Sequence, residues 1–216
     1  LSRRQRQMCI RDRDEVITGI ANLIESRDGS TGLHVKNTQN YVQILTKALR
    51  EKGMYPDILD HNYELNTVKA SVLHDIGKIK TPDAILLKPG RLTDEEFEVM
   101  KQHTVAGCEI IDRIIGNVEH EEYVDIARKI ARYHHERWDG TGYPDGLSGE
   151  EIPLCARIMA LADVFDALYQ DRCYKKAIRP ASKVFEIIKE NSGSQFDPNL
   201  TEIFLELQRE ITDISE

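Results

Sequence analysis

Residues 133–146 read YHHERWDGTGYPDG, and in this stretch one kind of sequence ends and another begins. Before it, apolar residues recur at helical spacing, and the adjacent His134 and His135 close that pattern. After it, glycine, proline and the single tryptophan, Trp138, predict a loop. Long loops in compact domains are usually functional, so a functional site is expected where the histidines meet the loop.

Most of the chain shows the spacing of amphipathic helices, and strand-like alternation is hard to find. Thr93 and Glu96 stand at the spacing of a capping box, just after the helix breakers Pro89 and Gly90. The predicted helices cover residues 14–25, a stretch around 41–49, about 65–79, a stretch from 93 onward, 118–136, a stretch from 153 onward, and two segments after 179 and 197. The sequence therefore predicts an all-α helical bundle with one long glycine-rich loop.

The composition limits the classes of function. A chain of 216 residues can bury one sizeable core without disulfides. The net charge of -8 argues against a general basic surface for nucleic-acid polymers, and no apolar run is long enough for a membrane span. The cysteines lie far apart without a CxxC pair, which indicates a reducing, cytoplasmic setting. They are Cys9, Cys108, Cys155 and Cys173.

The N-terminal residues differ from the rest of the chain. Residues 1–13, LSRRQRQMCIRDR, share no pattern with the later residues and are interpreted as a linker or a non-native segment, which leaves 14–216 as one domain. In the next helix, Ile17, Ile20 and Ile24 fit a coiled contact between two copies of the chain. Burial inside the same domain explains these three residues equally well.

Several polar side chains stand where apolar helical segments end. His74 and Asp75 follow the apolar run of SVLHDIGKIK, residues 71–80, and Lys78 lies one turn beyond His74. Asp163 lies within ALADVFDAL, where an unpaired carboxylate would carry a large desolvation cost. Further histidines at the ends or inner faces of other helices are His34, His103, His134 and His135. Together these side chains provide about what a two-metal site of nitrogen and oxygen ligands needs.

Each of these residues also has an ordinary interpretation. A His-Asp pair often lies on a helix surface, and adjacent histidines commonly end a helix. Asp163 could equally well form a structural ion pair with an arginine such as Arg157. Lys78 could be an ordinary solvent-exposed helix residue. The metal site is favoured because so many of these polar residues occur together at the ends or inner faces of separate helices. His61 and His120 lie in polar surroundings and are interpreted as surface residues.

Five motifs, in order along the chain, resemble an HD-GYP domain from about residue 14 to the C-terminus. They are HDIGK at 74–78, PDAILLKPGRLTDEEFEVMKQH at 82–103, HHERWDGTGYPDGLSGEEIPLCARI at 134–158, ADVFDAL at 162–168 and RCYKKA at 172–177. Gly142, Tyr143 and Pro144 match the family's signature. The wider HD superfamily comprises metal-dependent phosphohydrolases on a helical bundle, and its HD-GYP branch hydrolyses cyclic di-GMP, a bacterial second messenger. The resemblance thus implies a cyclic di-GMP phosphodiesterase.

The resemblance also implies a metal centre. Asp75 would bridge two divalent ions, and a hydroxide shared by the ions could attack the phosphodiester in line. Ligation by nitrogen and oxygen without a thiolate favours Fe or Mn. The ligands carried over from the family are His34, His74, Asp75, His103, His134, His135 and Asp163.

Other residues match the family's substrate contacts. Lys78 would contact a phosphate or act as the general acid, which makes it the second catalytic residue beside Asp75. Arg172 and Lys175 would bind the other phosphate, and Tyr143 could pack on a guanine. The substrate is expected to be cyclic di-GMP.

One position departs from part of the family. Some members hold a third metal ion with a glutamate four residues before the upstream histidine, and this sequence has Ser30 there. We therefore expect two metal ions. The linear dinucleotide pGpG is expected as the main product, with GMP as a further one.

Two alternatives stay open. One is an HD-type hydrolase of another cyclic dinucleotide, against which the intact GYP loop weighs. The other is a non-catalytic module whose loop docks a protein such as a diguanylate cyclase, against which the complete ligand set weighs. An upstream receiver or sensor module is expected in the full-length protein, and a homodimer remains open.

Overall fold

The computed structural model describes residues 15–28, 33–116, 121–170 and 177–215, and helices dominate these ranges. No strand occurs in them, apart from one isolated bridge between Ser192 and Phe196. After a helix over 15–25, the elements are η1 (Ser26–Asp28), α2 (His34–Glu51), α3 (His61–Ala70), η2 (Ser71–Leu73), η3 (Ile76–Lys80), α4 (Asp83–Leu86), α5 (Asp94–Ile115), α6 (Glu121–Tyr133), η4 (Gly149–Glu151), α7 (Leu154–Tyr169), α8 (Ala181–Glu190), α9 (Pro198–Glu206) and α10 (Gln208–Ser215). The predicted all-α class is confirmed.

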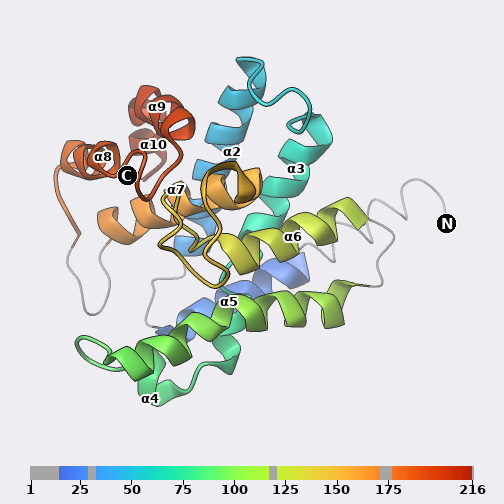
Figure 1. Cartoon of the computed structure of the whole chain (residues 1–216), viewed down its shortest axis with the longest axis vertical. Coiled ribbons are helices and arrows are strands. Elements are labelled where there is room, and N and C mark those ends of the chain that lie inside the picture. Colours follow the sequence, from blue (N-terminus) through green and yellow to red (C-terminus); the bar gives the residue numbers. More distant parts are fainter. Residues whose placement is uncertain (1–14, 29–32, 117–120, 171–176, 216) are drawn as a thin grey trace.

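The helices surround α7, which is buried on almost every side. α2 packs along α7, α3 packs on α2 and α6, and α5 runs beside α6 (Figure 1). The last three helices, α8, α9 and α10, lie together beside α7, and Phe165 of α7 contacts Phe185 of α8 and Phe204 of α9. Because α7 is central, the polar residues Arg157 and Asp166 on it are buried inside the bundle.

The start of α5 follows the predicted capping box. The Thr93 hydroxyl accepts a hydrogen bond from the Glu96 amide, and the Glu96 carboxylate accepts one from the Thr93 amide. Three acidic residues in the first turn also interact favourably with the positive end of the helix dipole. This prediction is confirmed, and it fixes where the helix that carries His103 begins.

The helix predicted over residues 65–79 is wrong in its bounds. α3 begins at His61, capped by the Asp60 carboxylate, and ends at Ala70, after which the chain continues in two short 3-10 turns. A Cβ atom on Gly77 would lie 1.8 Å from the His103 carbonyl oxygen, so this turn packs directly on the α5 backbone. The helix predicted around 41–49 begins earlier, so that His34 is the first residue of α2.

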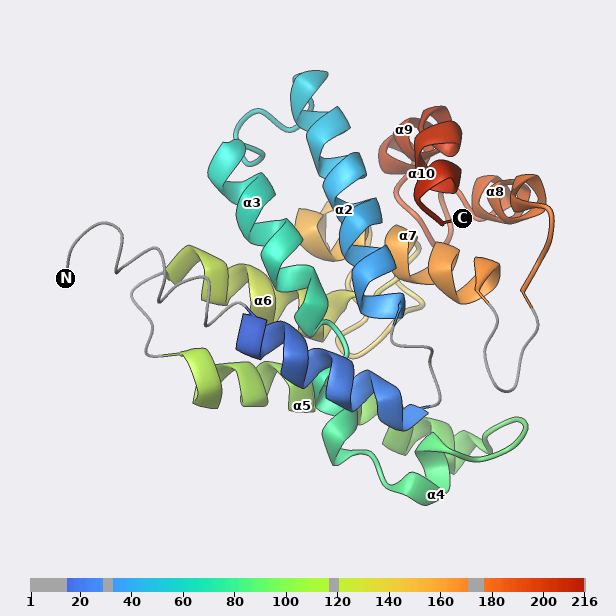
Figure 2. The same cartoon turned by 180° about the vertical axis from the view of Figure 1, so that it is seen from behind.

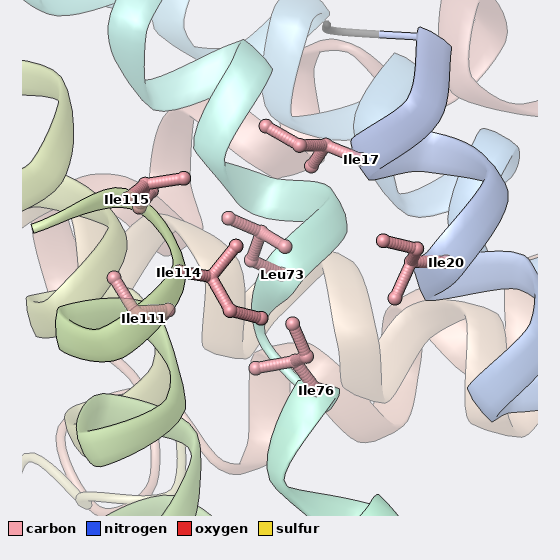
Figure 3. A pocket seen from close by; sticks show the side chains of 7 residues that line it. All are labelled: Ile17, Ile20, Leu73, Ile76, Ile111, Ile114 and Ile115. Atoms are coloured by element: carbon pink, nitrogen blue, oxygen red, sulfur yellow. The ribbon is translucent and has the colours of Figure 1, made fainter. Parts of the chain in front are cut away.

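The first helix packs against the segment that carries His74 and Asp75. Figure 3 shows Ile17 and Ile20 of this helix facing Leu73 and Ile76 across a small apolar pocket whose far wall belongs to α5. Figure 2 shows the same helix lying across the bundle near α5. Ile17 and Ile24 are buried within the chain, which accounts for these two residues without a second copy.

The glycine-rich loop after α6 is held by the side chain of Glu136. The buried Glu136 carboxylate accepts hydrogen bonds from the amides of Asp145, Gly146 and Leu147. A Cβ atom on Gly142 would lie 2.3 Å from the Arg137 nitrogen, so only glycine fits there. The loop therefore has a defined shape that places the following Tyr143 beside the end of α6.

Two other predictions concern the ends and the membrane. In the described part of the chain, no helix is both long and apolar enough to cross a bilayer. Residues 1–13 lie outside the described residues, so their interpretation as a linker or non-native segment stays a prediction, as does the single domain over 14–216.

Candidate metal centre

Three imidazoles from different elements converge on the Asp75 carboxylate. The Nε2 atom of His74 lies 3.3 Å from Asp75 Oδ2, and those of His103 and His134 lie 3.3 and 3.7 Å from Oδ1. His74 comes from the turn after α3, His103 from α5 and His134 from the end of α6. The structure thus brings together residues that are up to 60 positions apart in sequence, as the metal-site hypothesis requires.

Backbone carbonyls fix the orientation of these rings. The Nδ1 atoms of His74, His103 and His134 lie 2.9, 2.7 and 2.9 Å from the carbonyl oxygens of Ser71, Met100 and Ile130. With Nδ1 donating to a carbonyl, Nε2 of a neutral ring keeps its lone pair on the side of Asp75. Such contacts are the usual way in which a protein orients a metal-binding histidine.

The spacing of these atoms fits a cation. Among the described residues, Asp75 Oδ1, His103 Nε2 and His134 Nε2 are buried without a hydrogen-bond partner. Buried polar atoms normally find partners, because an unsatisfied one is costly. Ligand atoms about 2.0–2.2 Å from one ion stand about 3–3.5 Å apart, close to the separations seen here. The donor set suits a divalent ion.

Two groups of candidate ligands share Asp75. In the first, ligand atoms of Asp75, His103, His134 and His135 all lie within 4.8 Å of one another. In the second, the same holds for Glu25, His34, His74 and Asp75. Asp163 adjoins the second group, since its Oδ1 atom lies 3.4 Å from His34 Nε2. All seven predicted ligands therefore come together in two adjoining groups.

His34 is oriented by a carboxylate that the sequence analysis missed. Its Nδ1 atom lies 2.6 Å from Asp166 Oδ2, and Asn37 donates a hydrogen bond to the other oxygen of Asp166 at 3.1 Å. The Nε2 atom of the same ring lies 3.4 Å from His74 Nε2. Asp166 follows Asp163 by three residues on α7, so helical spacing alone could have identified it.

Glu25 is the other missed member of the site. It ends the first helix, its side chain is buried, and it reaches the second group from a segment that showed no motif. Arg157, considered as a purely structural partner for Asp163, instead donates to Asp197 at 2.6 Å. That alternative for Asp163 is therefore wrong, because the guanidinium faces the other side of α7.

The two groups differ in charge. Burial lowers the pKa of His74, but Asp75 and Asp163 outweigh it and raise the pKa to about 9. In the first group, burial lowers the pKa of His103 to about 4 and holds that of His135 well below its ordinary value. Burial also raises the pKa of Asp75, yet Lys78 and His74 hold it well below the usual range. Asp75 is therefore a carboxylate at neutral pH.

Lys78 and Tyr143 flank the two groups. The Lys78 ammonium lies 2.6 Å from Asp75 Oδ2. The Tyr143 ring stacks on His135, with centroids 4.8 Å apart, and meets Phe97 edge to face. Burial raises the pKa of the Tyr143 phenol, which therefore stays protonated as a hydrogen-bond donor.

A cavity of about 300 Å³ opens beside the first group. The Lys101 ammonium stands over the rings of Phe97 and Tyr143, 5.1 and 5.7 Å from their centroids. The lining includes Phe97, Lys101, His134, His135, Tyr143 and Gln195. A positive charge, aromatic rings and an amide at one wall suit an anionic ligand with a planar ring. Phe97 and Lys101 were not singled out from the sequence.

Three residues of the prediction fall outside the described residues. Arg172 and Lys175, expected to bind a phosphate, and Ser30, at the third-metal position, all lie there. Their roles stay predictions. Of the motif-loop residues, Gly142 packs on the backbone of Glu136 and Arg137, and Tyr143 stacks on His135. Pro144 follows Tyr143 in a cis peptide bond.

Known proteins support the same family. The family model described as "HD domain" matches residues 20–200. A cyclic di-GMP phosphodiesterase of Vibrio cholerae is 46% identical over 94% of this chain and 41% of its own length. The chain thus spans less than half of that relative.

Two solved structures share the fold. A cyclic GMP-AMP specific phosphodiesterase of V. cholerae superposes with a TM-score of 0.61 at 20% identity, over 92% of this chain and 52% of its own. An HD-GYP-type protein of Bdellovibrio bacteriovorus gives 0.58 at 17% identity, over 90% and 61%. With its ligand motifs in place and its family model matched over most of its length, the chain belongs to the HD domain family, in the HD-GYP branch.

Proposed function

We infer that this chain is a metal-dependent phosphodiesterase that hydrolyses cyclic di-GMP. The observation that carries the proposal is the position of Asp75, which two groups of buried ligands share directly beside a cavity lined by Tyr143 and Lys101. The name of the V. cholerae relative supports this choice of substrate.

The site would hold two divalent ions, Fe or Mn, through His34, His74, Asp75, His103, His134, His135 and Asp163. When bound, such ions act as Lewis acids and lower the pKa of a water molecule. The negative charge of the site supports two divalent ions. Four carboxylates lie in this largely buried site, and Lys78 is a cation beside them. The carboxylates are those of Glu25, Asp75, Asp163 and Asp166. Uncompensated, this charge would be very costly to bury.

The chain's own residues bind and orient the substrate. The Lys78 ammonium lies at the edge of the ligand groups and would contact the phosphate or protonate the leaving 3' oxygen. A guanine would enter the cavity next to Tyr143 and Phe97, with Lys101 toward a phosphate. Arg172 and Lys175 would bind the second phosphate. The buried histidine rings would limit access of bulk water to the site, apart from the water molecule that the reaction uses.

Two ions and Ser30 at the third-metal position favour pGpG as the main product, with slower release of GMP. An upstream receiver or sensor module, a diguanylate cyclase partner and a homodimer remain proposals. A second candidate function is hydrolysis of cyclic GMP-AMP, because a V. cholerae relative that is 37% identical over 89% of this chain is named a 3'3'-cGAMP-specific phosphodiesterase.

The test uses protein loaded anaerobically with Fe(II) or Mn(II) and three substrates: cyclic di-GMP, 3'3'-cyclic GMP-AMP and cyclic di-AMP. We expect cyclic di-GMP to be cleaved fastest, with pGpG resolved by chromatography and about two ions per chain. Preference for cyclic GMP-AMP would establish the second candidate. About two bound ions without turnover of any substrate would overturn the enzymatic proposal and favour a binding module.

A further inference from the structure

Glu25 is a buried carboxylate to which the proposed reaction assigns no role. It is the last residue of the first helix, and only 3% of its surface is exposed. Its Oε1 atom lies 3.6 Å from the Lys78 ammonium. Burying a carboxylate costs several kcal/mol unless a cation offsets it, so Lys78 accounts for part of this placement.

The same turn also holds the backbone of Lys78. Two residues after Glu25, the Arg27 guanidinium donates to the carbonyl oxygens of Lys78 and Ile79 at 3.4 and 3.2 Å. It also pairs with the Asp83 carboxylate at 2.6 Å. One short turn therefore contacts Lys78 twice, at the main chain through Arg27 and at the side chain through Glu25.

The residues just before Lys78 are also constrained by packing. The preceding Gly77 packs so closely on the His103 carbonyl that no Cβ atom fits between them. Leu73 and Ile76, which flank His74 and Asp75, face the first helix in Figure 3. The backbone around Lys78 is thus held by α5 and by the turn after the first helix, and its long side chain can still change its position.

Two carboxylates compete for that side chain. Lys78 lies 2.6 Å from Asp75 and 3.6 Å from Glu25. A cation that binds Asp75 would share its charge and weaken its attraction for Lys78. Glu25 would then keep the ammonium at the edge of the site. A carboxylate oxygen of Glu25 also lies within 4.8 Å of ligand atoms of His34, His74 and Asp75. The test must therefore separate a positioning role of Glu25 from a role as a metal ligand.

We propose that Glu25 is a positioning residue, which holds the Lys78 ammonium where it meets the substrate phosphate or the leaving oxygen. This inference rests on the proposed phosphodiesterase function. It differs from a role for Glu25 as a metal ligand, and the two roles predict different results when the carboxylate is neutralised.

The experiment compares Glu25→Gln, Lys78→Met and the double variant with wild type. Glu15→Gln, at the exposed start of the same helix, is the control. On cyclic di-GMP, Glu25→Gln is expected to lower kcat by about 10- to 100-fold with KM little changed, since general-acid help is worth about 100-fold or more. On bis(4-nitrophenyl) phosphate, whose leaving group needs no proton, kcat should change less than about threefold. The double variant should be no slower than Lys78→Met.

Two readouts do not depend on turnover. Glu25→Gln should keep the wild-type number of ions per chain. Its Lys78 should also be acetylated several-fold faster in a mass-spectrometric labelling experiment, because the side chain is released, while the exposed Lys189 should label at an unchanged rate. If wild type cleaves only bis(4-nitrophenyl) phosphate, the proposed substrate is wrong, and the labelling result still decides the role of Glu25.

Four outcomes would overturn the inference. Loss of one ion would make Glu25 a ligand. Equal losses of kcat on both substrates, or a double variant much slower than Lys78→Met, would show that Glu25 acts independently of Lys78. Unchanged labelling of Lys78 would show that Glu25 does not hold it.

Discussion

The two ligand groups on either side of Asp75 are oriented in related ways but lie in opposite electrostatic surroundings. On the α5–α6 side, backbone carbonyls hold His103 and His134, and burial lowers the pKa of His103 to about 4. On the α2–α7 side, carboxylates gather, and the pKa of His74 is raised to about 9. The first group thus presents neutral lone pairs to a cation, whereas a cation in the second must displace a proton.

In the proposed centre, this difference would allow one carboxylate to serve two cations. Asp75 supplies the charge that the first group otherwise lacks, and the second group draws on Asp163, Asp166 and Glu25 as well. The two groups should therefore lose their cations separately when one of their own histidine ligands changes, and together when Asp75 changes.

Asp75→Asn should have the largest effect, because the amide removes the charge that both groups share. We expect binding of both ions to be lost and hydrolysis to fall to the level of metal-free protein. Metal analysis per chain and turnover of cyclic di-GMP measure this, with the exposed Asp125→Asn on α6 as the matched control. Retention of both ions by Asp75→Asn would show that the two groups do not depend on a shared Asp75 carboxylate.

Loss of one histidine should separate the groups. His103→Ala removes a ligand on the α5 side and His34→Ala one on the α2 side, so each variant should keep about one of two ions. Metal counting after dialysis reads this out. If either variant lost both ions, the two groups would form one cooperative site and not two.

Asp166→Asn should have a smaller effect, since Asp166 orients His34 without binding a cation in the proposed centre. Loss of such an outer carboxylate typically weakens metal binding about 10- to 100-fold. Calorimetric titration should show this weakening for one ion only. An unchanged titration would mean that Asn37 and the packing of α2 are enough to orient His34.

The metal-free protein should show the smallest effect, in its pH dependence. Because the pKa of His74 is higher in the folded state, its protonation stabilises the fold. This contribution is complete at pH values below the ordinary pKa of 6.5 and is lost as the pH rises through 9. Between pH 7 and 8.5 the free energy of unfolding should fall by about 1–2 kcal/mol from this group.

Thermal unfolding in the presence of chelator measures this contribution. His74→Gln serves as the reference, because it lacks the titrating ring. A wild-type slope equal to that of His74→Gln would show that the proton is not held at His74.

Much of the site was predictable because its ligands occupy motifs. His74, Asp75 and the histidine pair stand next to helix ends, and the Thr93–Glu96 capping box fixed the start of α5. Periodicity failed near Gly77, where close packing on His103 replaces a regular helix by short turns. That contact joins segments distant in sequence, so local pattern carries no trace of it.

Glu25 and Asp166 were missed for different reasons. Asp166 lies one turn from Asp163, and its signal was present but unused. Glu25 enters through the packing of the first helix on Leu73 and Ile76, which only the tertiary structure reveals. The pairing of Arg157 with Asp197 could not be predicted from the sequence either, because it depends on which side of α7 faces α9.

The central claim is that two cations bind on opposite sides of Asp75. Anomalous diffraction from crystals of the Mn(II)-loaded protein tests it most directly. The account predicts two peaks, one near His103 and His134 and the other near His34 and His74, about 3.5–4 Å apart as in other two-metal sites. A single peak, or peaks that do not contact Asp75, would contradict it.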